Sequence, residues 1–200
     1  MKYLLAAVVM ALSSTTIFPG TAAAQAEDAF GKSRATPHLP AYDEAMRLMR
    51  TDAEQGDATA KYNLGFMYDY GQGVAENDAE AARWYRLAAD QGSASAQYSL
   101  GLLYGIGAGV PENGAEAAKW FRLAAEQGHA SAQANLGVMI ANGERVSEDH
   151  AQAYKWLKLS AAQGQKDTIE RKNRLQPWMT PAQIAEAQKL SAAWKPVGER

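Results

Sequence analysis

A phrase of ten residues recurs three times in this chain at a constant spacing of 36 residues. Its copies read RWYRLAADQG, KWFRLAAEQG and KWLKLSAAQG, and they begin at Arg83, Lys119 and Lys155. A fixed period of this length, with aromatic and glycine residues at constant offsets, is typical of solenoids whose units stack on their neighbours. The repeat therefore predicts a stacked array rather than one globular core.

The repeat extends well beyond this phrase when the chain is stacked at the same period. Six columns hold the same residue type in all three units: a leucine, the glycine directly after it, a second glycine, a valine, a tryptophan and the glycine that ends the phrase. Tyr68 and Tyr104 align in a further column, in which the third unit has Ile140. The fully matched columns are Leu64, Leu100 and Leu136; Gly65, Gly101 and Gly137; Gly71, Gly107 and Gly143; Val74, Val110 and Val146; Trp84, Trp120 and Trp156; and Gly92, Gly128 and Gly164.

Two segments within one unit have apolar residues at helical spacing. Ala60, Leu64 and Tyr68 lie at i, i+4 and i+8, which predicts a first helix over about 57–70. The apolar residues from Ala81 to Ala89 follow i, i+3, i+4, i+7 and i+8, which predicts a second helix with one broad apolar face. The glycine after the leucine lies inside the first helix, where it costs about 1 kcal/mol relative to alanine. We expect a close crossing of the two helices to compensate.

The tryptophan column lies on the apolar face of each predicted second helix. We expect these indoles to be structural anchors that are buried between neighbouring helices. The alternative is a row of exposed aromatic side chains that contact a sugar or a peptide. The three positions are Trp84, Trp120 and Trp156.

Helix start and stop signals agree with the periodicity. A side chain that can cap a helix stands three residues before Glu or Gln at the start of each second helix, which resembles a capping box. The glycine that ends each repeated phrase suits the left-handed residue that closes a helix. The predicted capping pairs are Asn77 with Glu80, Asn113 with Glu116 and Asp149 with Gln152.

Together these columns resemble the Sel-1-like repeat family, a relative of the tetratricopeptide repeats with a longer internal loop. The third unit departs most from the pattern, at Ile140, Arg145 and Ser160. The resemblance implies an all-α fold, an α/α superhelical solenoid that binds other proteins, commonly in bacterial envelope processes. The three units are 57–92, 93–128 and 129–164.

Helical caps are expected at both ends, because a solenoid must cover its last apolar faces. Residues 41–56 align with a second helix and predict an N-terminal capping half-repeat in which Leu48 takes the tryptophan position. Residues 165–200 predict C-terminal capping helices, one ended by Pro177 and the next begun at Thr180 by a capping box. The alternative is a C-terminal tail that binds a partner helix in a groove.

The N-terminus has the features of a signal peptide at 1–26. Lys2 precedes a short apolar run, and Ala24-Gln25-Ala26 fits the small-x-small rule for cleavage. The apolar run is too short for a permanent membrane span, which disfavours the alternative of an uncleaved anchor. We therefore expect a periplasmic or secreted protein with a flexible lead-in at 27–40 and no membrane span after cleavage.

Composition excludes several classes of function. The chain has no cysteine, which excludes disulfides, thiolate metal sites and lipid attachment at cysteine. Without residues 1–26 it holds 19 basic and 22 acidic residues, a net charge of −3 that does not favour a nucleic-acid partner. The short basic cluster Arg171, Lys172 and Arg174 fits a solvated helix face.

No motif for catalysis or for a cofactor is found in the sequence. His38, His129 and His150 lack a second metal ligand at i+3 or i+4. No serine lies in a G-x-S-x-G elbow, and the glycine pairs lack the rest of a phosphate-binding loop. We therefore expect a non-enzyme without metal or cofactor. The alternative is a cell-wall-related hydrolase or a β-lactam-binding protein.

A partner-binding surface is predicted on the first helices, which line the concave side of tetratricopeptide-like superhelices. Positions turned away from Leu64 and Tyr68 should face a protein or peptide partner, as in a scaffold, adaptor or regulator of the bacterial envelope. Large aromatic side chains favour the N-terminal half of this surface. In the alternative, the aromatic members only pack against adjoining helices. The predicted residues are Thr59, Tyr62, Phe66, Asp69, Ser95, Tyr98, Leu102, Ser131, Ala134 and Val138.

Overall fold

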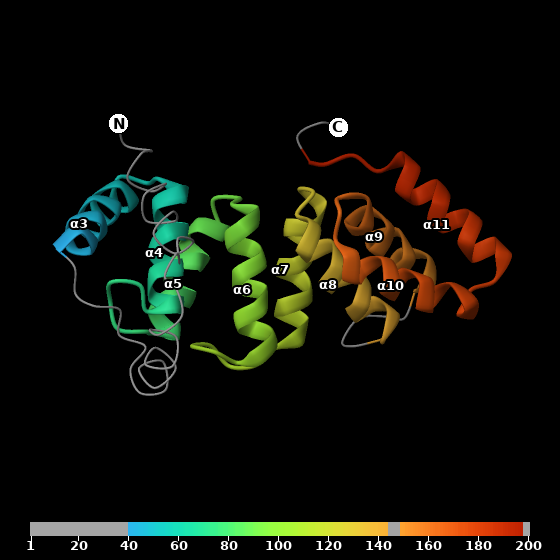
Figure 1. Ribbon diagram of the computed structural model, residues 1–200, viewed down its shortest axis with the longest axis horizontal. Coiled ribbons are helices and arrows are strands. Elements are labelled where there is room, and N and C mark those ends of the chain that lie inside the picture. The colour runs from blue at the N-terminus through green and yellow to red at the C-terminus, as the bar shows by residue number, and fades with distance from the viewer. Residues whose placement is uncertain (1–39, 144–148, 198–200) are drawn as a thin grey trace, which may run out of the picture.

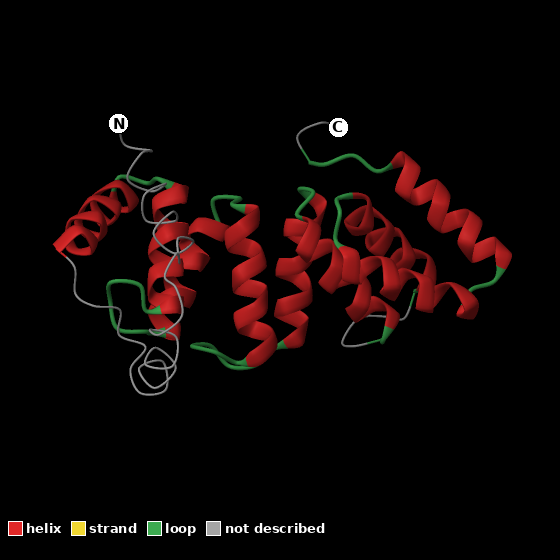
Figure 2. Ribbon diagram, viewed as in Figure 1, coloured by secondary structure: helices red, strands yellow, loops and turns green. Residues whose placement is uncertain are grey.

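The computed structural model describes residues 40–143 and 149–197, and in these ranges the chain is helical with no strand (Figures 1 and 2). The predicted signal peptide, nearly all of the lead-in and the third-unit loop with Arg145 lie outside the described residues. The helices are α3 (Pro40–Glu54), α4 (Ala58–Tyr70), α5 (Asp78–Ala89), α6 (Ala94–Ile106), α7 (Gly114–Glu126), α8 (Ala130–Ala141), α9 (His150–Ala162), α10 (Lys166–Leu175), the 3₁₀ helix η1 (Gln176–Trp178) and α11 (Pro181–Ala193).

The helices form consecutive antiparallel pairs that stack in a row. The most extensive contacts lie within the pairs α4 with α5, α6 with α7 and α8 with α9. Each pair then packs on the next through its second helix, α5 on α6 and α7 on α8 (Figure 1). This arrangement confirms the predicted α/α solenoid.

The mid-helix glycines lie where the two helices of a pair cross. A Cβ atom added at each glycine would overlap a side chain of the second helix, so only glycine permits the observed approach. This confirms the expectation that a close crossing compensates for the low helix propensity of glycine. The closest distances from such a Cβ are Gly65 to Tyr85, 2.5 Å; Gly101 to Phe121, 2.7 Å; and Gly137 to Leu157, 2.8 Å.

The tryptophan column is buried, as expected for structural anchors. Trp84, Trp120 and Trp156 are 7%, 5% and 3% exposed, so the alternative of an exposed aromatic row is wrong. Trp84 belongs to a core cluster with Ala53 of α3, which shows that the indole packs toward the preceding unit. Leu48 has the same register in α3 but is 40% exposed, because no described helix precedes α3. Leu48 therefore shares the register of the tryptophans but not their burial.

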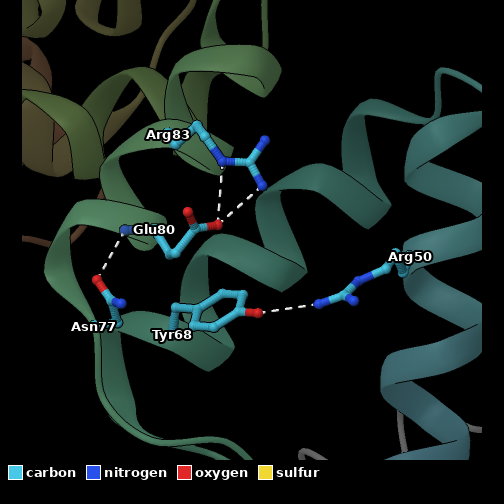
Figure 3. A network of polar contacts seen from close by, with 5 residues as sticks. All are labelled: Arg50, Tyr68, Asn77, Glu80 and Arg83. Carbon is cyan, nitrogen blue, oxygen red and sulfur yellow. Dashed lines mark hydrogen bonds and ion pairs between the residues drawn. The ribbon is translucent and has the colours of Figure 1, made fainter.

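The second helices begin with one-sided caps, in which only the N-cap side chain is bonded, rather than with full capping boxes. The Asn77 side chain accepts a hydrogen bond from the backbone N–H of Glu80 at 3.1 Å. The Glu80 carboxylate pairs with Arg83 at 2.9 Å instead of returning to the N-cap (Figure 3). Asn113 and Asp149 cap α7 and α9 in the same one-sided way. In α5 and α7 a lysine or arginine one turn on pairs with the glutamate, which the sequence pattern did not indicate.

Two interactions join the second helix of one unit to the first helix of the next. Arg50 donates a hydrogen bond to the Tyr68 hydroxyl at 3.1 Å (Figure 3), and Arg86 donates one to Tyr104 in the following unit. In the third unit Ile140 stands at the tyrosine register and offers no hydroxyl. The third interface therefore lacks a bond that the first two share.

A buried glutamine also links neighbouring units. Gln133 is fully buried, and its side-chain N–H donates to the Ala125 carbonyl at 3.1 Å. Its side-chain oxygen accepts from Gln163 at 2.9 Å. Polar groups in a core are stable only when they are hydrogen-bonded, so these bonds fix the relative position of the units. The same arrangement occurs one unit earlier at Gln97, Ala89 and Gln127.

The start of α11 agrees with the prediction. Thr180 is its N-cap and Gln183 completes a capping box, with Pro181 in the first turn. The preceding helix α10 ends at Leu175, and η1 carries the chain across to α11. The turn chemistry in this segment was therefore readable from the sequence.

Helix α11 covers the C-terminal end of the array by packing against α9. Ala187 of α11 is fully buried, and Trp194 meets Trp156 edge-on with ring centroids 6.3 Å apart. Beyond α11, the backbone N–H of Val197 donates to the Glu126 carbonyl at 2.8 Å. The C-terminal segment is thus docked on the solenoid in this structure.

Candidate functional site

The predicted partner-binding residues lie on α4, α6 and α8, and a fourth helix continues this series. Helices α4, α6, α8 and α10 begin at residues 58, 94, 130 and 166, a constant step of 36. In α10, Thr168 stands at the register of Ala132 and is buried against Ser160, with the hydroxyl oxygens 3.3 Å apart. Helix α10 is therefore the first helix of a partial fourth unit.

The predicted surface residues combine partial burial with exposure to solvent. Thr59 is exposed, and Leu102 is exposed over 37% of its surface. The other predicted residues are half-buried, and they are Tyr62, Phe66, Asp69, Ser95, Tyr98, Ser131, Ala134 and Val138.

The aromatic members of this set pack against neighbouring rings on one side. Tyr62 lies 5.6 Å from the Tyr85 ring centroid, and Phe66 lies 4.5 Å from that of Tyr70. Both rings are nevertheless only half-buried. Core contact thus fixes the orientation of these rings while part of each remains accessible.

Tyr98 is held from two directions. Its ring lies 5.8 Å from Phe121 and stacks on the His129 imidazole at 4.7 Å. His129 is also the N-cap of α8, because its Nδ1 accepts from the backbone N–H of Ala132 at 3.3 Å. Burial lowers the pKa of His129, which favours the neutral ring that this capping bond needs.

Asp69 is attached to the core by the second helix of its own unit. The Tyr85 hydroxyl donates to the Asp69 carboxylate at 3.0 Å. Burial raises the pKa of Asp69, and the bond from Tyr85 opposes that shift. Burial also raises the pKa of the Tyr62 phenol nearby. This end of the surface is therefore a constrained polar cluster rather than a freely solvated carboxylate.

A cavity of about 460 Å³ lies at the C-terminal end of the series. It contains Val138, one of the predicted residues, and Arg174, which follows Val138 by one repeat length. Helices α8, α9 and α10 and the 3₁₀ helix η1 all contribute to its lining. The residues that give it its chemical character are Val138, Leu157, Leu175, Arg171, Arg174 and Trp178.

The basic part of this cavity was not recognised as a site from the sequence. Arg171 and Arg174 are exposed, as expected for a solvated helix face, and both also line the cavity. Lys172 instead lies over the Tyr154 ring at 5.9 Å. Trp178 is 79% exposed, and no pattern singled it out. The repeat register could have indicated this site, because the column of Phe66, Leu102 and Val138 continues to Arg174.

Within 40–143 and 149–197, no group of three or more His, Asp and Glu residues could hold a metal ion. In the same part of the chain, no helix has both the length and the apolar character needed to cross a bilayer.

The Sel1 repeat family model matches the chain over residues 58–93, 94–129 and 130–165. These ranges follow the predicted units with a shift of one residue. A search of the curated proteins gave no match.

Two crystal structures are similar to the chain. A Sel1 repeat protein from Oxalobacter formigenes has 38% identity and a TM-score of 0.61, over 64% of this chain and 52% of that one. A protective antigen present in uropathogenic Escherichia coli strains, displaying an SLR fold, has 37% identity and a TM-score of 0.68, over 74% of this chain and 32% of that one. The chain thus spans about half of the first protein and about a third of the second.

Proposed function

The chain belongs to the Sel1 repeat family, whose members are generally non-catalytic scaffolds for protein interactions, and from this premise we propose that it binds a polypeptide along its first helices. The partner lies in the concave groove of the superhelix and contacts α4, α6 and α8. Binding alone, without chemistry on the partner, is the proposed activity.

One observation carries this proposal: half-buried aromatic side chains recur at one register of successive first helices. Tyr62 and Tyr98 are 36 residues apart, and each packs on the second helix of its own unit. Side chains whose orientation is already fixed lose little conformational entropy when a partner binds. Aromatic residues of this kind commonly supply most of the binding free energy at an interface.

The test replaces Tyr62 and Tyr98 by alanine in one variant and measures capture of a partner from the producing cell. The expected result is loss of the captured protein, while circular dichroism and melting show a folded chain. A matched control is Leu87→Ala with Leu123→Ala, because these leucines are also 36 residues apart and partly exposed, but lie on second helices. A folded tyrosine variant that binds normally, or one that fails to fold, removes these residues from the site.

The proposed location is the bacterial periplasm or the surrounding medium. Support comes from Lys2, the short apolar run behind it and the Ala24-Gln25-Ala26 cleavage pattern. N-terminal sequencing of protein from the producing cell should begin at or near Glu27. Recovery of an intact Met1 from the envelope would contradict this location.

A further inference from the structure

We propose that the cavity between α8, α9 and α10 binds an acidic side chain of the partner, with a large apolar side chain two residues away from it in the partner sequence. The inference rests on the proposed function, because it specifies the chemistry of the partner segment that reaches the C-terminal end of the same surface. The occupant is an internal, extended stretch of polypeptide in which an acidic residue and a large apolar residue lie two positions apart, because side chains at i and i+2 of an extended chain point to the same side.

The charges that line the cavity favour an acidic ligand. Arg171 and Arg174 both contribute to the lining, and none of its described residues is Asp or Glu. A guanidinium group binds a carboxylate through two parallel hydrogen bonds, which makes arginine well suited to this recognition. The cavity therefore selects for negative charge.

The ion pair that Arg174 already makes does not prevent this recognition. Arg174 lies 3.8 Å from Glu170, and the two side chains are 82% and 76% exposed. Exposed pairs of this kind contribute little free energy, so a partner carboxylate can replace Glu170 with a small loss. The repulsion from Glu170 that remains weakens binding but does not reverse its sign, because two arginines face the cavity.

The apolar part of the cavity accounts for the second component of the ligand. Val138, Leu157 and Leu175 line it together with Trp178. Trp178 is 79% exposed, while Leu175 and Met179 on either side are 9% and 8% exposed. The buried neighbours hold the backbone of this segment in place, so the indole projects from a fixed backbone position. An exposed tryptophan beside aliphatic side chains is suited to bind an apolar side chain.

The register of the repeats places this cavity in line with the proposed groove. The same offset is occupied by Phe66, Leu102, Val138 and Arg174 in successive first helices. An extended partner that follows this column meets aromatic and aliphatic side chains first and the two arginines last. The position of the acidic residue along the partner is therefore set by the repeat spacing.

The test measures fluorescence polarisation with an N-acetylated, C-amidated, labelled peptide in which glutamate and leucine lie two residues apart, separated by serine. We expect Arg171→Gln with Arg174→Gln to weaken its binding by about 10-fold or more, and Trp178→Ala to have a similar effect. The control for total charge is Arg122→Gln with Lys189→Gln, two cations that do not line the cavity. This control should leave binding within about 2-fold of the wild type.

Several outcomes would overturn the inference. The first two are equal binding of the glutamate peptide by the wild type and the Arg171/Arg174 variant, and no binding of this peptide by the wild type. The third is that the wild type binds a peptide with lysine in place of glutamate equally well. The fourth is that the wild type binds the peptide only when it has a free C-terminal carboxylate. If the Tyr62/Tyr98 variant loses the captured protein while the arginine variant keeps it, the cavity assignment fails and the proposed function stands. If the tyrosine variant keeps its partner and the arginine variant loses both partner and peptide, the proposed tyrosine surface fails and the cavity assignment stands.

Discussion

Gly101 of α6 lies directly against the ring of Phe121 on α7, and a Cβ atom at this position would stand 2.7 Å from the ring. Gly101→Ala should therefore destabilise the protein by about 1–3 kcal/mol through overpacking, even though alanine favours the helix. Urea unfolding followed by circular dichroism measures this change.

Gly105 in the same helix provides the matched control. A Cβ atom there would meet only the Ala117 Cβ, at 4.0 Å. Gly105→Ala should leave stability unchanged or raise it by up to about 1 kcal/mol, because the helix gains propensity without a clash. Equal destabilisation by the two alanines would show that the Phe121 contact is not the cause.

Trp120 and Trp178 should respond in opposite ways to truncation. Trp120 is 5% exposed between two units, so Trp120→Ala should cost about 3–5 kcal/mol because its neighbours cannot fill the space. Trp178→Ala should change stability by no more than about 0.5 kcal/mol, since its ring is largely in solvent. Thermal and urea unfolding compare the two variants. An unchanged stability in the Trp120 variant would refute the assignment of this residue as an anchor.

Gln133 should stabilise the fold through hydrogen bonds rather than through packing. Gln133→Met keeps a side chain of similar length but removes both the donor to Ala125 and the acceptor for Gln163. The expected loss is about 1–3 kcal/mol in the free energy of unfolding, because buried polar groups lose their partners. Gln188→Met, on the exposed side of α11, is the control and should have little effect. Two indistinguishable variants would rule out this role for the glutamine.

His129 should make the stability depend on pH. Burial lowers its pKa below the ordinary value of 6.5, so the unfolded chain binds the proton more readily than the folded chain does. The stability that neutral His129 contributes is therefore fully present above pH 6.5 and is lost as the pH falls through its folded pKa.

His129→Asn isolates this contribution, because asparagine is also a good N-cap but does not titrate. The wild type should lose more unfolding free energy than the variant as the pH is lowered from neutral, and titration of other histidines cancels in this comparison. Urea unfolding at a series of pH values provides the measurement. Parallel pH profiles for the two proteins would contradict the assignment.

Much of the fold could be predicted because the repeat encodes it locally. The glycine at each crossing and the tryptophan at each interface carry the same structural role in every unit, so one correct interpretation applies to three positions. Leu48 shows where this reasoning stops, because its burial depends on whether a helix precedes α3 rather than on its register.

Helix α10, the first helix of the partial fourth unit, was harder to recognise because polar residues occupy the positions that are apolar in the earlier units. Thr168 stands where earlier units have alanine, and its burial depends on the hydroxyl of Ser160 from another helix. A periodicity based on apolar residues cannot detect such a pair, so α10 was predicted only as part of a cap. For the same reason Arg171 and Arg174 were not placed beside Val138.

For the proposed binding surface, the sequence indicated which helices carry the residues but not how accessible each side chain is. The sequence placed Tyr62 and Tyr98 on one face, but partial burial results from the distances to Tyr85, Phe121 and His129. These distances follow from how the helices cross, which the chain specifies through many contacts at once. Tyr62 and Tyr98 therefore fit neither alternative alone, since each side chain packs on the core and is also partly exposed to solvent.

The backbone hydrogen bond from Val197 to Glu126 makes the two ends of the array unequal in their resistance to local unfolding. In a one-dimensional stack, opening starts at the end whose last interface is weakest. The C-terminal end is covered by α11 and fastened to an earlier unit by this bond, whereas α3 is the outermost described helix at the other end. Backbone amides of α4 should therefore exchange with deuterium before those of α9. Partial unfolding would therefore disrupt the part of the proposed surface that carries Tyr62 and Phe66, while the part that carries Arg171 and Arg174 is still folded.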